Sequence, residues 1–182
     1  MVKTAKRTGA RGKNAGGKPK PRTSGARTRA GMRGGPTGDK APAKLPMPYK
    51  PAYRFLEHTA DIMIESTGPD FPSALVQAAG AMFHVMGRAR PKTAFQVDVH
   101  ASNDEELVVY FLSQILSESE AREMVPARVD ILRHETAVPH IQAKVWGEEK
   151  RPRDAIKAVT FHELKVECDL IKGCRIQVLL DV

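Results

Sequence analysis

The 182-residue chain has few cysteines, few aromatic residues and no long apolar stretch. Its two cysteines, Cys168 and Cys174, are too few for the disulfide framework of a small secreted protein, so we interpret them as reduced, packed thiols. No run approaches the ~18 consecutive apolar residues of a membrane span, and the N-terminal sequence lacks the apolar segment of a secretory signal. The sequence therefore predicts a protein of a reducing compartment, the cytoplasm, without membrane contact.

The signatures of common enzymes are also missing. The chain has no Gly-rich phosphate loop, no nucleophile elbow and no His-Glu-x-x-His zinc motif. Its six histidines are scattered without metal-ligand spacing, and two thiols alone make a poor zinc site, because a structural zinc ion takes four ligands. We therefore interpret His84 and His100 as ordinary histidines whose hydrogen bonds are satisfied.

Acidic residues are nearly absent from residues 1–50, which hold fourteen Lys or Arg and a single acid, Asp39. The remaining residues hold fifteen Lys or Arg and twenty acids, so the net charge of +8 combines a basic tail with an acidic domain. The tail also holds nine of the fourteen glycines and almost no large apolar residue. Such a segment cannot bury enough apolar surface to offset the entropy of ordering. We predict a disordered basic tail over residues 1–50 and a folded domain over residues 51–182.

The composition of the tail suits weak, nonspecific contact with nucleic acid, because Lys and Arg neutralise phosphates and release counterions. A solubilising or targeting extension is the alternative. An Arg-rich, acid-poor start is also typical of organelle transit peptides, although the glycines oppose the amphipathic helix of such a peptide.

Apolar periodicity predicts an α+β domain from Tyr53 onward, with two helices packed on one mainly antiparallel β-sheet. A helix cap is expected at Asp70 and a capping box at Ser102-x-x-Glu105. The expected elements are a strand over 61–67, a helix over 71–86, a strand over 95–99, a helix from about 103 to 116, and strands over 129–131, 141–145, 155–168 and 176–180.

Three polar features accompany these strands. Glu57-His58-Thr59-Ala60-Asp61 precedes the first strand, where a simple strand lead-in is an equally good interpretation. Asp181 ends the last strand beside the α-carboxylate of Val182, and clustered carboxylates repel each other unless they are protonated or bridged by a cation. Oxygen-only ligands suit Ca²⁺ or Mg²⁺. Lys157 is a lone cation in an apolar strand, where a lysine can also serve to block edge-to-edge aggregation.

Several short motifs resemble the archease family, in the family's order and over residues 53–182. They are His58-Thr59-Ala60-Asp61, the helix end Ala81-Met82-Phe83-His84-Val85-Met86, Trp146-Gly147-Glu148, the strand Lys157-Ala158-Val159-Thr160-Phe161-His162, and the terminal Leu180-Asp181-Val182. The tail has no counterpart in the family. The segment 148–154 is shorter than the family's loop and lacks its histidine, so no contact of that loop is carried over.

The resemblance implies an accessory protein rather than an enzyme. Archease proteins promote guanylylation and multiple turnover of the GTP-dependent RNA ligase that joins tRNA halves in tRNA splicing. By resemblance, Asp61 and Asp181 are ligands of a divalent metal, with Val182 as a third, and the metal is expected to be calcium, with magnesium and manganese as alternatives. Lys157 corresponds to a lysine important for ligase activation. The expected site thus comprises Asp61, Asp181, Val182 and Lys157, lined further by Glu57, a usually acidic position, and by His58.

Two other functions remain compatible with the residues. A metal-dependent hydrolase acting on RNA or nucleotides would need a base beside the metal, for which His58 is the best candidate and Ser66 a weaker one. An RNA-binding chaperone would work through residues 1–50. Its RNA binding would survive a change at Asp61 and disappear with the tail.

Overall fold

The computed structural model of the chain describes residues 52–58, 60–153 and 156–182. The tail predicted for residues 1–50 lies outside these ranges, so its disorder and the domain boundary stay predictions. In chain order the elements are β1 (Tyr53–Leu56), β2 (Ile62–Gly68), α1 (Phe71–Met86), β3 (Thr93–His100), α2 (Asp104–Ala121), β4 (Met124–Glu135), β5 (His140–Glu149), β6 (Ala158–Asp169) and β7 (Gly173–Asp181). None of the helices described is long and apolar enough to cross a membrane.

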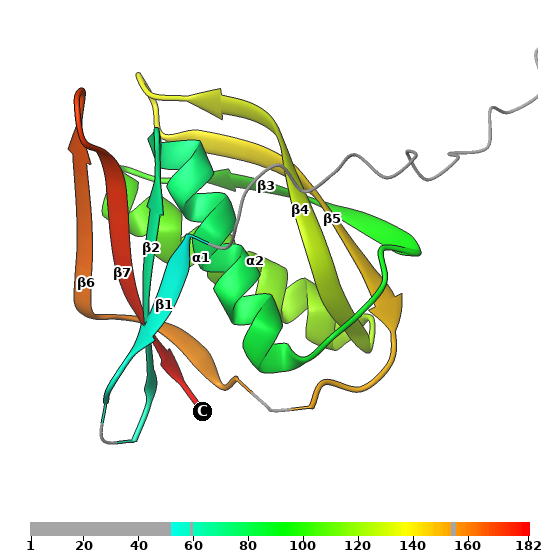
Figure 1. Ribbon diagram of the computed structural model, residues 1–182. Helices are drawn as coiled ribbons and strands as arrows, with labels where there is room; N and C mark the ends of the chain where they lie inside the picture. The colour runs from blue at the N-terminus through cyan, green and yellow to red at the C-terminus, as the bar shows by residue number, and fades with distance from the viewer. Residues whose placement is uncertain (1–51, 59, 154–155) are drawn as a thin grey trace, which may run out of the picture. The chain divides into compact units, whose positions relative to one another are not determined.

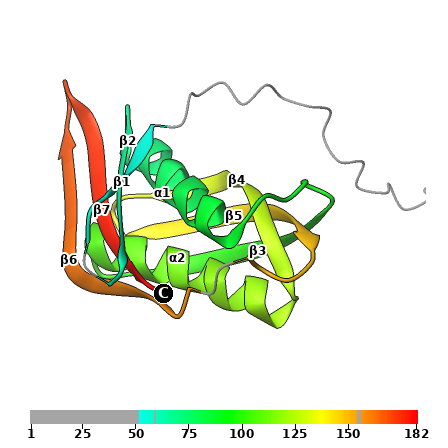
Figure 2. The ribbon, with the colours of Figure 1, turned by 60° about the horizontal axis from the view of Figure 1, so that its bottom comes forward.

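The strands form two antiparallel sheets with both helices between them. One sheet has the strand order β1-β2-β7-β6 and the other β3-β5-β4 (Figure 1). Helix α1 contacts β2 and β7 on one side and β4 on the other, while α2 contacts β6 of the first sheet and β3 of the second (Figure 2). The α+β class and the two helices on antiparallel sheet are confirmed.

The prediction of a single sheet is wrong, and the burial of α1 gives the physical reason. Ten of its residues are buried, including the alanines at 74, 78, 79 and 81. These residues cover more than the single apolar stripe of a helix that lies on one sheet. A helix buried on two sides needs an apolar layer on each side, and the second sheet supplies it.

Helix α1 begins as predicted, and α2 begins one residue later than predicted. The Oδ1 of Asp70 accepts a hydrogen bond from the backbone N–H of Ser73 at 2.8 Å. In α2 the cap is Asn103 instead of Ser102, because the Oδ1 of Asn103 accepts from the N–H of Glu106 at 2.8 Å. The Glu106 carboxylate in turn accepts from the N–H of Ser102 at 2.9 Å. The pattern resembles a capping box, except that the Glu106 side chain accepts from the residue before the cap instead of from the cap itself.

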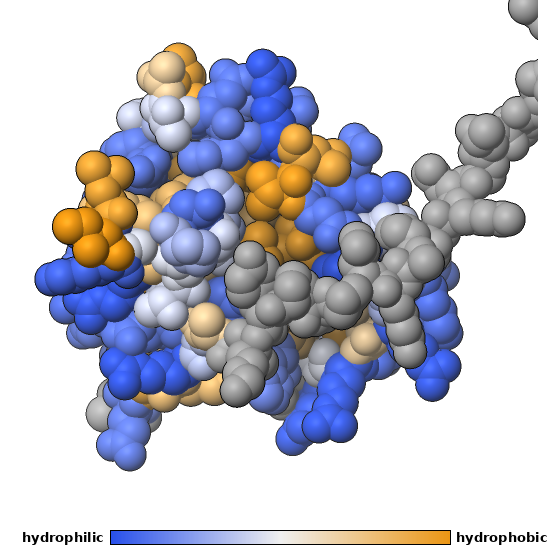
Figure 3. Space-filling view, turned by 45° about the horizontal axis from the view of Figure 1, so that its top comes forward, coloured by the Kyte–Doolittle hydropathy of each residue, from blue (hydrophilic) through white to orange (hydrophobic). Residues whose placement is uncertain are grey.

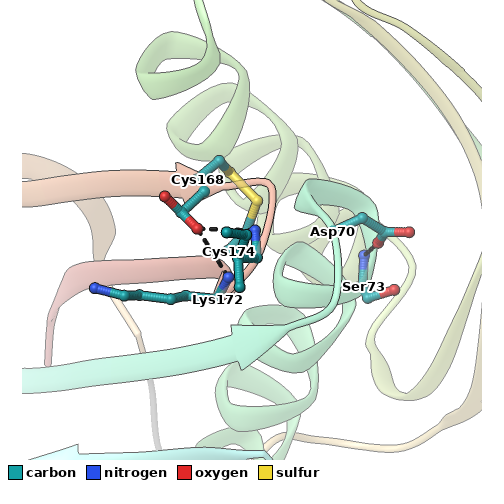
Figure 4. The surroundings of a disulfide bond; sticks show 7 residues. Asp70, Ser73, Cys168, Lys172 and Cys174 are labelled. Carbon is teal, nitrogen blue, oxygen red and sulfur yellow. Dashed lines mark hydrogen bonds between the residues drawn. A yellow bond between two sulfur atoms is a disulfide. The ribbon is translucent and has the colours of Figure 1, made fainter.

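The two cysteines are joined by a disulfide bond, which overturns the interpretation of reduced thiols. Cys168 and Cys174 lie directly opposite each other at the tip of the β6–β7 hairpin, with their Cα atoms 4.0 Å apart (Figure 4). The turn between them is also held by Asp169, whose Oδ1 accepts from the N–H groups of Ile171 and Lys172. The cysteines therefore give no support to a reducing compartment.

An ion pair between Lys92 and Glu148 ties the segment before β3 to the end of β5. The Nζ of Lys92 lies 2.5 Å from Oε1 of Glu148, and this contact is the main reason why the pKa of Glu148 falls from 4.5 to about 2. A carboxyl group with a lowered folded-state pKa stabilises the fold above its ordinary pKa and loses that contribution as the pH falls.

We therefore expect Glu148→Gln to lower the melting temperature at pH 7 and to have little effect at pH 2. The difference between wild type and variant should shrink as the pH falls from about 4.5 towards 2, because over that range the carboxyl of the unfolded wild-type chain takes up a proton while that of the folded chain stays largely ionised. Thermal melts followed by circular dichroism at several pH values measure this difference. A difference that stays constant with pH would rule out the ion pair as its source.

Candidate functional site

The beginnings of β2 and β6 and the end of β7 meet at one end of the first sheet (Figure 1). Ile62 pairs with Leu180, and Ala158 pairs with Asp181. Asp61 directly precedes Ile62 and Asp181 directly follows Leu180, so the two acids flank the last pair of the β2–β7 ladder at the same end of the sheet. The pairing of β7 with β2 and β6 thus brings the motif around Asp61 and the C-terminal motif around Asp181 to the same end of the sheet.

Lys157 contacts both residues at the end of β7. Its backbone N–H donates to the carbonyl oxygen of Asp181 at 2.8 Å. Its Nζ donates to the backbone oxygen of Val182 at 2.7 Å and lies 3.7 Å from Oδ1 of Asp181. Lys157 precedes β6 instead of lying inside the strand as predicted. About two thirds of its side chain stays exposed, so a partner's anionic group can reach the ammonium.

His58 lies beside Asp61 on the approach to β2. Its Nδ1 is 3.8 Å from Oδ2 of Asp61, and both side chains are partly buried. This nitrogen is buried and has no hydrogen-bond partner in the part of the chain that the structure describes. Glu57 is exposed, and no side-chain contact links it to the other site residues described. Of the predicted lining residues, the structure therefore places His58 against Asp61 and leaves Glu57 outside the contacts.

The donor atoms at this end of the sheet fit a hard divalent cation. They are the carboxylates of Asp61 and Asp181 and the backbone oxygen of Val182, an oxygen-only set of the kind that Ca²⁺ prefers. The ammonium of Lys157 already lies against Asp181 and Val182. Two of the three groups, Asp181 and Val182, therefore already face a positive charge, and a bound cation would compete with Lys157 for them.

The two residues proposed for hydrolytic chemistry, His58 and Ser66, differ in their access to solvent. Ser66 is fully buried, and its hydroxyl is shared between two backbone acceptors, the carbonyl oxygens of Ala74 at 3.0 Å and Ile176 at 3.4 Å. It therefore cannot reach a substrate, and His58 is left as the one base that the sequence suggested. His84 is an ordinary histidine as expected, with its Nδ1 3.1 Å from the hydroxyl of Tyr53.

A second polar cluster was missed by the sequence analysis. Asp98, His100 and His140 bring a carboxylate oxygen and two ring nitrogens within 4.8 Å of one another on the β3–β5 pair. The local signal was weak: Asp98-x-His100 places two potential ligands on one face of a strand. The third ligand is forty residues away and becomes apparent only from the strand register.

The opposite end of the first sheet carries an open groove. The groove lies between α1, β4 and the β6–β7 turn. At the tip of that turn Leu170 and Ile171 are fully exposed. Figure 3, which brings the end of the molecule with this turn forward, shows hydrophobic surface there beside hydrophilic surface.

Comparison with known proteins gives one consistent result. The model of the Archease protein family matches residues 53–182. A protein archease of Methanosarcina acetivorans is 34% identical over 140 residues, which cover 71% of this chain and 95% of the relative. A protein archease of the fish Ictalurus punctatus is 31% identical over 136 residues, which cover 70% of this chain and 83% of the relative.

Two solved structures share the fold. Protein 1598 of Methanobacterium thermoautotrophicum is similar with a TM-score of 0.62 and 25% identity, covering 73% of this chain and all of that one. A Thermotoga maritima protein described as "an archease, possible chaperone" is similar with a TM-score of 0.55 and 23% identity, covering 70% of this chain and 94% of that one. The family match extends over the whole described domain, including both strand ends of the candidate site, and the chain therefore belongs to the archease family.

Proposed function

We propose that this protein is a non-enzymatic, metal-binding activator of the GTP-dependent RNA ligase that joins tRNA halves. The observation that carries the proposal is the position of Lys157, an exposed ammonium held by Asp181 and Val182 where three strands end. In an archease-family chain, this is a surface equipped to meet an anionic group of a partner enzyme.

The chemistry of Lys157 suits that role. A lysine ammonium is a compact charge on a flexible stem, and its three donors adapt to a carboxylate or phosphate. Its contacts with Asp181 and Val182 hold it near the surface without burying it. A partner's anion can exchange for either contact, because exposed ion pairs contribute only about 0–1 kcal/mol.

The proposed metal is a calcium ion held by Asp61, Asp181 and the backbone oxygen of Val182, with Mg²⁺ and Mn²⁺ as alternatives. When bound, such an ion supplies positive charge that offsets the two carboxylates. Lys157 would then be released from Asp181 and Val182 and could face the partner, so the metal and the lysine would share one surface.

We expect Asp61→Asn and Asp181→Asn each to weaken Ca²⁺ binding at least about tenfold. Each substitution removes a charged ligand from the same ion, so the double variant should lose little beyond either single one. Isothermal titration of the full chain with Ca²⁺, Mg²⁺ and Mn²⁺ measures this. Asp169→Asn, at the other end of the β6–β7 hairpin, is the matched control and should bind as wild type does. Unchanged affinity in both site variants would remove the metal from the proposal.

The activator function itself is tested by the first chemical step of the ligase. The cognate ligase is incubated with labelled GTP, with and without the purified full chain, and the guanylylated ligase is counted. We expect faster guanylylation with the chain present and no labelling of the chain itself. Turnover of RNA or nucleotide by the chain alone, lost in His58→Ala, would favour the hydrolase hypothesis. RNA binding that is lost with residues 1–50 and insensitive to Asp61→Asn, without any effect on the ligase, would favour the chaperone.

A further inference from the structure

The cluster of Asp98, His100 and His140 lies in the second sheet, apart from the strand ends of the first. His100 and His140 are directly opposite each other in the β3–β5 ladder, and Asp98 is opposite Gln142. Side chains two residues apart on a strand point to the same face. Phe95, Val97 and Val99 face the buried layer, so Asp98 and His100 face outward. The pairing brings His140 to the same outer face.

The two rings and the carboxylate already converge. Nε2 of His140 is 2.7 Å from Oδ1 of Asp98, and Nε2 of His100 is 3.6 Å from the same oxygen. The rings are stacked in parallel with centroids 3.9 Å apart. Ligand atoms 2.0–2.2 Å from a tetrahedral zinc ion are separated from each other by about 3.3 Å. The two distances to Asp98 lie on either side of that value. Because an imidazole lone pair lies in the ring plane, the exposed His100 ring must turn out of the stack before both rings and Asp98 can bind one ion.

Neighbouring residues orient these groups. Oδ2 of Asp98 accepts a hydrogen bond from the side-chain amide of Gln142 at 2.7 Å, which leaves Oδ1 directed at the histidines. Nδ1 of His140 lies 3.8 Å from Oε1 of Glu135 on β4. Because a carboxylate only accepts hydrogen bonds, Nε2 of His140 carries the proton in its 2.7 Å contact with Asp98, and a bound zinc ion would replace that proton. The Glu135 carboxylate near Nδ1 would then favour the tautomer protonated at Nδ1. His140 is almost fully buried while His100 is two-thirds exposed, so one ligand is fixed and the other can adjust.

We propose that Asp98, His100 and His140 form a binding site for a divalent transition metal of the zinc class. Two imidazole nitrogens and one carboxylate suit Zn²⁺, Co²⁺, Ni²⁺ or Cu²⁺, whereas Ca²⁺ takes oxygen ligands. Three protein ligands leave the remaining position for water or an exchangeable group. This site is chemically distinct from the oxygen-only site at Asp61 and Asp181, and it stands whether or not the proposed ligase activation is correct.

Titration of the full chain with Zn²⁺ tests the proposal, using protein purified without a histidine tag. We expect one Zn²⁺ per chain, and a loss of affinity of at least about tenfold in His100→Ala and in Asp98→Asn, since each removes a ligand. Both side chains are largely exposed, so neither substitution should unfold the protein. Substitution of the buried His140 is a less reliable test for that reason, and His140→Gln serves as a supplementary variant.

Three controls separate this site from the other ways of binding zinc. His162→Ala removes an exposed histidine of β6 and Asp61→Asn removes a ligand of the proposed calcium site, and both should bind Zn²⁺ as wild type does. The variant with Cys168→Ser and Cys174→Ser should also bind it, because the ligands are nitrogen and oxygen. Co²⁺ bound to the wild-type chain should show stronger d–d absorption than Co²⁺ in water, because four-coordinate Co²⁺ absorbs more strongly than the six-coordinate aqueous ion. This stronger absorption should be absent in His100→Ala. Equal zinc affinity in His100→Ala and wild type, or no binding at 100 µM Zn²⁺, would overturn the proposal.

Discussion

Replacing Lys157 with alanine should remove most of the stimulation of the RNA ligase and leave the protein folded. The side chain is largely exposed, and its contacts are with the end of β7 and not with the core. Surface substitutions of this kind change the free energy of unfolding by about 0.5 kcal/mol or less. A charge directed at a partner's anion affects the partner's reaction far more, and we expect a loss of at least about tenfold in stimulation.

Lys165→Ala is the matched control for that experiment. Lys165 is likewise an exposed lysine, but it lies inside β6 and pairs with Gln177, well away from the strand ends. Its removal changes the net charge by the same amount and should leave stimulation unchanged. Circular dichroism checks that both variants fold, and Ca²⁺ titration checks that both still bind metal. If Lys157→Ala stimulates the ligase fully, the lysine serves only to keep the sheet edge soluble.

Gly173→Ala should destabilise the fold by at least about 2 kcal/mol. Gly173 has φ of +79°, and a Cβ atom there would lie 2.3 Å from the carbonyl oxygen of Gly68, a backbone atom. The left-handed conformation costs a non-glycine residue about 1–2 kcal/mol, and overpacking adds about 1–3 kcal/mol. Chemical denaturation gives the free energy of unfolding directly.

Gly80→Ala provides a control of the opposite sign. Gly80 is inside α1, and a Cβ atom there meets nothing closer than a ring carbon of Tyr53 at 3.8 Å. Alanine is favoured over glycine in a helix by about 0.5–1 kcal/mol, so this variant should be more stable than wild type. If both variants behave alike, the close approach of Gly68 and Gly173 is not what constrains the hairpin.

Local sequence patterns predicted the helices and strands. The arrangement of the strands in two sheets depends on long-range pairing, which those patterns do not contain. Apolar spacing located α1 and its cap at Asp70, because both depend on residues within one helical turn. The split into two sheets depends on β3 pairing with β5 instead of β2, which no local pattern specifies. The cap of α2 was misplaced because Ser102 and Asn103 are adjacent and both are good capping residues.

The candidate site divides in the same way. The resemblance to archease proteins singled out Asp61, Lys157 and Asp181, and the register shows why residues so far apart in sequence lie at the same end of one sheet. Nothing in the sequence linked His100 to His140, since their relation is a cross-strand pairing. The disulfide was missed because the small number of cysteines was taken as a sign of a reducing compartment. Their positions on either side of a hairpin turn are what bring the two sulfur atoms together.

The most direct test of the central claim is the number of ligated RNA molecules formed per ligase molecule. The cognate ligase joins tRNA halves with GTP under conditions of excess RNA, alone or with the full-length chain. We predict that the wild-type chain raises the number of turnovers, that Lys165→Ala does so equally, and that Lys157→Ala does not. A product yield per ligase that is the same with and without the wild-type chain, at saturating concentration and with Ca²⁺, Mg²⁺ or Mn²⁺ present, would contradict the assignment as a ligase activator.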